Sequence, residues 1–181
     1  MAPSRQVSLI PYSTPCAFVE RLDVAVARPH RDALTLRYTL VGKRQRLRVP
    51  APRTPARADE LWRHTCFEAF LKIAGARGYY ELNFSPSLEW AAYRFSAYRT
   101  GMTPDPEQSA PQLEVHPDLE GLALGAHVPL SPALASAAAL TLGLAAVVES
   151  DDGTLSYWAL RHPASRPDFH HSDSFQLELA G

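Results

Sequence analysis

Residues 60–102 read ELWRHTCFEAFLKIAGARGYYELNFSPSLEWAAYRFSAYRTGM, and this segment decides the fold that the sequence predicts. It holds two of the three Trp, four of the seven Tyr and four of the seven Phe residues, with acids and bases between them. Three runs within it alternate with a period of two, the side-chain period of a β-strand. These predicted strands lie at residues 65–73, 79–85 and 89–98, and residues 74–78 supply a hairpin loop between the first two.

The first of these runs is apolar on both sides, which is typical of a central strand covered on two faces. Glu68 lies on one of these apolar sides, where a carboxylate is costly unless it is paired or hydrogen-bonded. Ordinary strand packing explains most of the aromatic residues nearby. It does not explain Trp62 at the strand entrance, Glu68, or the polar residues Asn83 and Arg94 on the following strands. We therefore expect any ligand site to be built from these four residues.

Short alternating runs continue on both sides of this segment. On the N-terminal side they occupy residues 17–28, 33–41 and 45–49, with a tight turn predicted at Gly42-Lys43. On the C-terminal side they occupy residues 112–116, 122–130, 141–149, 155–160 and 174–179. Asp151-Asp152-Gly153 predicts a hairpin turn, and Ser131-Pro132 predicts the N-cap and first turn of a short helical segment. About ten or eleven antiparallel strands with one short helical segment predict an all-β sandwich that forms one domain over residues 1–181.

Composition excludes several classes of function. The formal net charge is −1, and we interpret the six basic residues between positions 43 and 57 as a solvated strand face and a proline-rich linker. Neither feature favours nucleic acid as a partner. The sequence contains no run of about 18 apolar residues, so it predicts no membrane span. The N-terminal residues lack the apolar stretch of a signal peptide, and we therefore expect a cytoplasmic protein. Two cysteines do not require a disulfide framework, and Cys66 is expected to be a buried thiol.

A second group of polar residues lies near the C-terminus, around the motif PDFHHSD at residues 167–173. Asp168 and His170 are two residues apart and share a face of an extended chain. With His171 and a third ligand from elsewhere they are weak candidates for a divalent metal site. The alternative is a turn in which Asp caps backbone groups and His donates to neighbours. Ser174 lacks the sequence context of a hydrolase nucleophile.

The motifs LWRHTCFEAFL, YYELNFSPSLEWAAYRF, AHVPLSPAL and SYWALRHPASRPDFHHSDSF resemble the DOMON-like proteins of bacteria. Those proteins are related to family 9 carbohydrate-binding modules and to haem- and sugar-binding DOMON domains. The resemblance covers about residues 59–179, and its most specific parts are Trp62 with Glu68, the NFSPS segment and PDFH. It implies an immunoglobulin-like β-sandwich with a ligand cleft on one sheet face.

The resemblance also implies roles for individual residues. In the sugar-binding relatives two aromatic rings enclose the sugar, and a Glu and an Arg hold its hydroxyls. Trp62 and Glu68 match half of that pattern, Arg94 matches the Arg, and Trp158 matches the second aromatic ring. Haem-binding relatives use axial Met and His, for which Met102 is available here. Such relatives are often exported, whereas no export signal is expected in this chain.

Together these observations predict a non-enzymatic protein without a cofactor that binds a small molecule. The ligand they favour is a carbohydrate or a sugar-containing metabolite. Trp62 would stack on the sugar, while Glu68, Asn83 and Arg94 would hydrogen-bond to it. Three alternatives remain open at this point: a metal protein or enzyme using the PDFHH segment, a haem-binding protein, and a protein-interaction module. The sequence predicts no oligomeric state.

Overall fold

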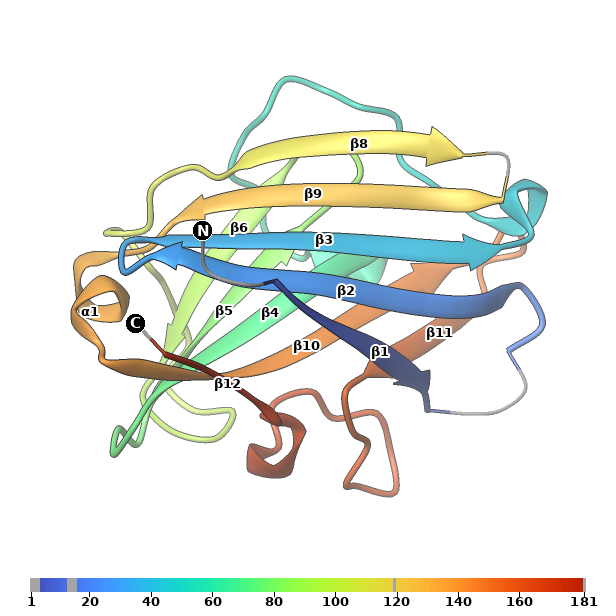
Figure 1. The fold of residues 1–181 in the computed structure, drawn as a ribbon. Helices are drawn as coiled ribbons and strands as arrows, with labels where there is room; N and C mark the ends of the chain where they lie inside the picture. The colour runs from blue at the N-terminus through green and yellow to red at the C-terminus, as the bar shows by residue number, and fades with distance from the viewer. Residues whose placement is uncertain (1–3, 13–15, 119, 181) are drawn as a thin grey trace.

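The computed structural model describes residues 4–12, 16–118 and 120–180, and it confirms the all-β class. Antiparallel strands form one sheet that curls until its two halves face each other (Figure 1). The described strands are β1 (Arg5–Pro11), β2 (Val19–His30), β3 (Ala33–Gly42), β4 (Cys66–Ile73), β5 (Tyr79–Phe84), β6 (Trp90–Phe95), β7 (Thr103–Pro104), β8 (Gln112–Asp118), β9 (Gly121–Pro129), β10 (Ala139–Glu149), β11 (Leu155–Ala159) and β12 (Leu177–Ala180). The helical elements are α1 (Pro132–Ser136) and the 3-10 turns η1 (Arg44–Arg46), η2 (Leu61–Arg63) and η3 (Ser172–Ser174).

Strand β1 joins the two halves of the sheet. Residues 5–9 pair with β2, whereas Ile10 and Pro11 pair with β11. The resulting strand order is β7-β6-β5-β4-β10-β11-β1-β2-β3-β9-β8, and β12 pairs separately with β10. In Figure 1 strands β1, β2, β3, β9 and β8 lie in front, and β4, β5, β6, β10 and β11 lie behind them. We call these the front half and the back half.

The main hydrophobic core fills the space between the two halves. The period-two pattern of each strand turns one set of side chains inward, such as Leu22 and Val24 of β2 and Phe67 and Leu71 of β4. One polar contact crosses this core: the Tyr38 hydroxyl of β3 donates to the backbone carbonyl of Glu68 at 2.8 Å. Since Tyr38 is fully buried, this bond attaches the front half directly to the strand that carries Glu68.

A second, smaller apolar cluster lies on the outer face of the back half. Phe70, Tyr79, Tyr93 and Phe95 belong to it, and Phe169 and Phe175 of the C-terminal segment cover it. Strand β4 is therefore buried on both faces, as its sequence predicts. This covered outer face is where the polar residues of the back half collect.

Sequence and structure differ at three places. The predicted strand at residues 45–49 is wrong: its start forms η1, and Leu47 makes only a single bridge to Ser150. Arg46 and Arg48 instead bind acids at the end of the β10–β11 hairpin, and the neighbour of β3 is β9. The sequence pattern also fails to predict β1 and the two-residue β7.

The predicted turn is confirmed at the β10–β11 hairpin, where Gly153 adopts a φ of +84°. The predicted helix start is only partly confirmed at α1. Ser131 does occupy the N-cap and Pro132 the first helical position, but the Ser131 side chain makes no capping bond. Among residues 4–12, 16–118 and 120–180, no helix has the length and apolar character needed to cross a membrane.

The Tyr38 contact leads to a stability prediction. Tyr38→Phe removes the hydroxyl and leaves the buried Glu68 carbonyl without that donor, which we expect to cost about 1 kcal/mol of unfolding free energy. Urea denaturation measures this loss. Tyr80→Phe is the matched control, because the Tyr80 hydroxyl has no partner in the described part of the chain, and its effect should stay within about 0.5 kcal/mol. Equal losses for both variants would contradict the role assigned to this bond.

Candidate functional site

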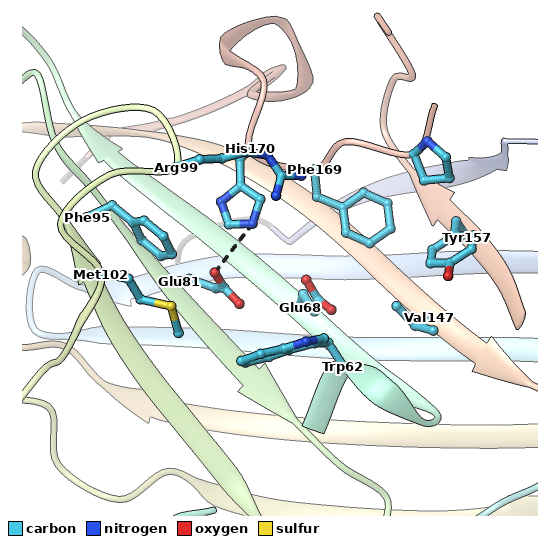
Figure 2. A pocket seen from close by; sticks show the side chains of 11 residues that line it. Trp62, Glu68, Glu81, Phe95, Arg99, Met102, Val147, Tyr157, Phe169 and His170 are labelled. Atoms are coloured by element: carbon cyan, nitrogen blue, oxygen red, sulfur yellow. Dashed lines mark ion pairs between the residues drawn. The ribbon is translucent and has the colours of Figure 1, made fainter. Parts of the chain in front are cut away.

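A cavity of about 390 Å³ opens on the outer face of the back half (Figure 2). Its floor is formed by residues of β4, β5 and β10, and its walls come from three connecting segments. Trp62 of η2 lies on one side, and Phe169 and His170 of the C-terminal segment lie on the opposite side, with two carboxyl groups between them. We call this the Trp62 cavity.

The two carboxyl groups on the floor belong to Glu68 and Glu81. Glu68 pairs with Asn83 across β4 and β5, and Glu81 pairs with Phe70, so the two acids are diagonal neighbours on the same sheet face. Both are buried. Burial, together with the nearby Glu81, raises the pKa of Glu68 well above its usual range. Two acids therefore sit where water solvates neither well.

Glu81 is held by one good hydrogen bond. Asn83 Nδ2 donates to Glu81 Oε1 at 2.8 Å, which favours the charged carboxylate. Burial is the larger effect and raises the pKa of Glu81 to about 7. Two other acceptors beside it are unsatisfied: Glu68 Oε1 and Asn83 Oδ1 are buried and have no hydrogen-bond partner within the described chain. The floor therefore offers acceptors that lack donors.

Trp62 is half-buried and leans its edge against Tyr93, with ring centroids 5.8 Å apart at an interplanar angle of 68°. The Tyr93 hydroxyl in turn donates to Asp59 Oδ1 at 2.6 Å. The indole is thus held by Tyr93 on one side while it lines the cavity. A flat aromatic ring held beside buried acceptors is the arrangement that sugar recognition needs.

The opposite wall is fastened by Asp168, which is only 3% exposed. Arg99 donates to Asp168 Oδ1 from Nη2 at 2.9 Å and from Nε at 3.2 Å, the Tyr98 hydroxyl donates to Oδ2, and the His170 backbone N–H donates at 3.1 Å. Burial alone would raise the pKa of Asp168, but the Tyr98 and Arg99 donors outweigh it and leave the pKa below its ordinary value. Arg99 itself has a left-handed backbone with φ of 51°, a strained conformation that side-chain contacts compensate.

His170 borders the cavity as a neutral imidazole. Its Nδ1 lies 2.8 Å from the Tyr79 hydroxyl, whose oxygen also accepts from the Arg99 backbone N–H. Burial and the nearby Arg99 lower the pKa of His170 to about 4. Its Nε2 is 3.8 Å from Glu81 Oε2, the contact dashed in Figure 2. Since both pKa shifts favour neutral groups, this contact is not a charged pair between about pH 4 and 7.

The structure brings together some of the predicted site residues. Trp62 and Glu68 line one cavity, and Asn83 lies fully buried beside it, connected through Glu81. The other two lie elsewhere. Arg94 shares the face of Trp90, with its Nε 3.3 Å from Asp105 Oδ1, and does not line the cavity. Trp158 is 2% exposed in the core between the halves, where its Nε1 donates to Ser156 Oγ at 2.7 Å.

The three candidate metal ligands do not form a ligand set. Asp168 is occupied by Arg99 and Tyr98, and His170 by Tyr79, while His171 Nδ1 accepts from the Asp173 backbone N–H. Across the described residues, no group of three or more His, Cys, Asp or Glu side chains is placed to hold a metal ion. The PDFHH segment instead forms the wall that faces Trp62.

Sequence reasoning did not identify Arg99 as a site residue, because it lies in a loop whose left-handed turn has no periodic signal. It gave Glu81 no binding role either, although Glu81 shares a strand face with Asn83 two residues away. That shared face was the available signal, since period two places both side chains over the same floor. Met102 was noted only as a haem ligand and proves to line the Trp62 cavity.

The comparisons with known proteins can now be set beside this geometry. No family model and no curated protein matches the sequence. Among solved structures, a candidate carbohydrate-binding protein from Bacteroides uniformis matches with a TM-score of 0.65 at 12% identity, covering 98% of this chain and 86% of that one. A family 9 carbohydrate-binding module from Caldicellulosiruptor kristjanssonii, solved in complex with cellotriose, matches with a TM-score of 0.60 at 11% identity, covering 98% and 82%. At such identities the likeness shows a shared fold, so the implied relation to family 9 modules is confirmed at the level of fold.

Proposed function

We propose that the Trp62 cavity binds a saccharide without chemical conversion. The observation that carries the proposal is Glu68, a buried carboxyl group with an unpartnered Oε1 on the floor of a cavity bordered by a half-exposed Trp. A sugar supplies hydroxyl donors to such acceptors and an apolar C–H face to the indole. The two similar folds, one of them solved with cellotriose, support the same ligand class and a β-sandwich description of the curled sheet.

The energetics of the floor also support a ligand. Burying Glu68 and Glu81 with incomplete hydrogen bonding destabilises the fold, because a buried polar group without a partner costs free energy. Apolar residues would pack this face more favourably. Such local costs are typical of sites where function rather than stability decides the residue.

Size is consistent with a small saccharide. A cavity of about 390 Å³ lies near the lower end of the ordinary range for small-molecule sites. It suits one or two sugar rings rather than a large cofactor.

Haem is the second candidate, favoured by one observation: Met102 and His170, the two residue types that can bind haem iron axially, line the same cavity. Against it, a haem ring would face the buried carboxyl groups of Glu68 and Glu81. Added haem should give no Soret band with the purified protein, and a stoichiometric band would replace the saccharide proposal.

The first functional prediction concerns the stacking ring. Cellobiose and a panel of neutral mono- and disaccharides are titrated by calorimetry and by Trp fluorescence. Trp62→Ala should weaken binding of the best ligand at least tenfold, a loss of about 1.4 kcal/mol, because the stacking surface is removed. The ligand-dependent fluorescence change should disappear with it.

The matched control is Trp158→Phe, which alters a Trp outside the cavity. It should keep both the affinity and the fluorescence change. Binding that survives Trp62→Ala in a folded protein would refute the assigned stacking role, and absence of binding to every sugar would refute the proposed function.

The second prediction concerns pH. The pKa of Glu81 is about 7 in the folded chain against about 4.5 when exposed, so the loss of stability from its ionisation is absent below pH 4.5, grows between pH 4.5 and 7, and is complete above pH 7. Glu81→Gln stays neutral and should raise the unfolding free energy at pH 8 by roughly 3 kcal/mol, with the gain vanishing near pH 4. His170 titrates in both proteins, so its contribution cancels when their unfolding free energies are subtracted.

Denaturant unfolding at pH 8 and pH 4 measures this gain. Glu20→Gln, an exposed acid on β2, is the control and should change stability little at either pH. The same Glu81→Gln variant should bind the sugar more weakly, because an amide replaces an acceptor oxygen in the floor. A gain that does not depend on pH would contradict the pKa assignment.

A further inference from the structure

A second cavity, of about 400 Å³, lies next to the Trp62 cavity at the end of the back half where β4 and β5 join. His170 lines both cavities. The second cavity is lined by Lys72 of β4, Arg77 of the β4–β5 loop, and residues of the C-terminal segment that include His171 and Ser172. We call it the Lys72 cavity.

The Lys72 cavity has two basic side chains in its lining, Lys72 and Arg77, and no Asp or Glu belongs to the lining. His171 adds a directed donor: its Nδ1 accepts from the Asp173 backbone N–H at 3.2 Å, so the proton of the neutral ring lies on Nε2. A cavity with two cations and no acid attracts an anion.

Nothing in the described chain neutralises these cations. Neither Lys72 nor Arg77 forms an ion pair with any residue of 4–12, 16–118 or 120–180. Asp168, which holds the neighbouring C-terminal segment, is already bound by Arg99, Tyr98 and the His170 backbone.

We propose that the Lys72 cavity binds an anionic group, a phosphate or a carboxylate, and that this group is a substituent of the saccharide held in the Trp62 cavity. The ligand class is then an acidic sugar rather than a neutral one. This inference rests on the proposed function for its saccharide part, whereas the anion site rests on Lys72, Arg77 and His171 alone. Because His170 lines both cavities, a saccharide in one cavity can place a substituent in the other.

The acidic floor of the Trp62 cavity does not oppose an anionic ligand at mildly acidic pH. Burial raises the pKa of Glu68 well above its usual range, and the pKa of Glu81 at about 7 leaves Glu81 largely protonated at pH 6. Glu81 then presents a donor as well as an acceptor to sugar hydroxyls.

Calorimetry at pH 6 with four probes tests the proposal: glucose, glucuronate, glucose 6-phosphate and inorganic phosphate. We expect the two acidic sugars to bind about tenfold more tightly than glucose. In the double variant Lys72→Gln/Arg77→Gln this preference should fall to within about twofold, while glucose binding stays unchanged. The preference of the unaltered protein should also weaken at high salt, since partly exposed charges are screened.

The matched control is Arg37→Gln/Lys43→Gln, which removes the same charge from cations outside both cavities that form no ion pair in the described chain. It should retain the acidic preference, and thermal unfolding checks that both double variants are folded. Equal affinity for glucose and the acidic sugars, or a preference that survives Lys72→Gln/Arg77→Gln, overturns the inference while leaving saccharide binding intact.

Inorganic phosphate separates the two sources of the anion. Weak phosphate binding that the Lys72→Gln/Arg77→Gln variant loses, combined with tighter binding of glucose 6-phosphate, supports a substituent on a sugar. Phosphate binding of the same strength as that of glucose 6-phosphate, with no response to glucose, supports the anion site and overturns its link to a sugar. No response to any of the four probes overturns the inference, whereas the proposed function is decided by the saccharide panel.

Discussion

The ion pair between Arg99 and Asp168 is the interaction on which the whole site depends. It connects the loop after β6 to the C-terminal segment, two parts of the chain that share no strand pairing. Because Asp168 also binds the Tyr98 hydroxyl and the His170 backbone, one buried carboxylate sets the position of Phe169 and His170 over the sheet. Without this anchor the outer face of the back half would lack its second wall. Removing Arg99 would leave the buried Asp168 carboxylate without its charged partner, which is costly.

Period-two alternation was sufficient to predict most strands, since each has one face in the core. It failed at residues 45–49, where Arg46 and Arg48 alternate with apolar residues but bind acids of the β10–β11 hairpin instead of extending a sheet. It also failed at β1, whose partners β2 and β11 lie far apart in the sequence. The local sequence pattern predicts which face of the sheet a side chain lies on. It carries no information about which distant strand will pair with the strand that bears it.

The site was predictable to the extent that it depends on strand faces. Trp62 and Glu68 line one cavity, and the resemblance to sugar-binding proteins pointed to both. Arg94 was assigned by analogy, although its own alternation places it with Trp90 on the other face of β6. Arg99 was out of reach because a left-handed loop residue has no periodic signature. The sheet therefore explains the floor of the site, whereas its walls depend on loop contacts that only three-dimensional packing reveals.

The position of β1 also has a consequence for how the molecule can fail. This strand closes the curled sheet between β2 and β11, because it pairs with β2 up to Leu9 and with β11 after it. Detachment of β1 would expose two sheet edges at once, each with unpaired backbone donors and acceptors. An edge on either half can accept the same strand from another copy of the chain. Strand exchange and aggregation are thus the misfolding routes that this topology favours, and they begin at a segment far from the cavities.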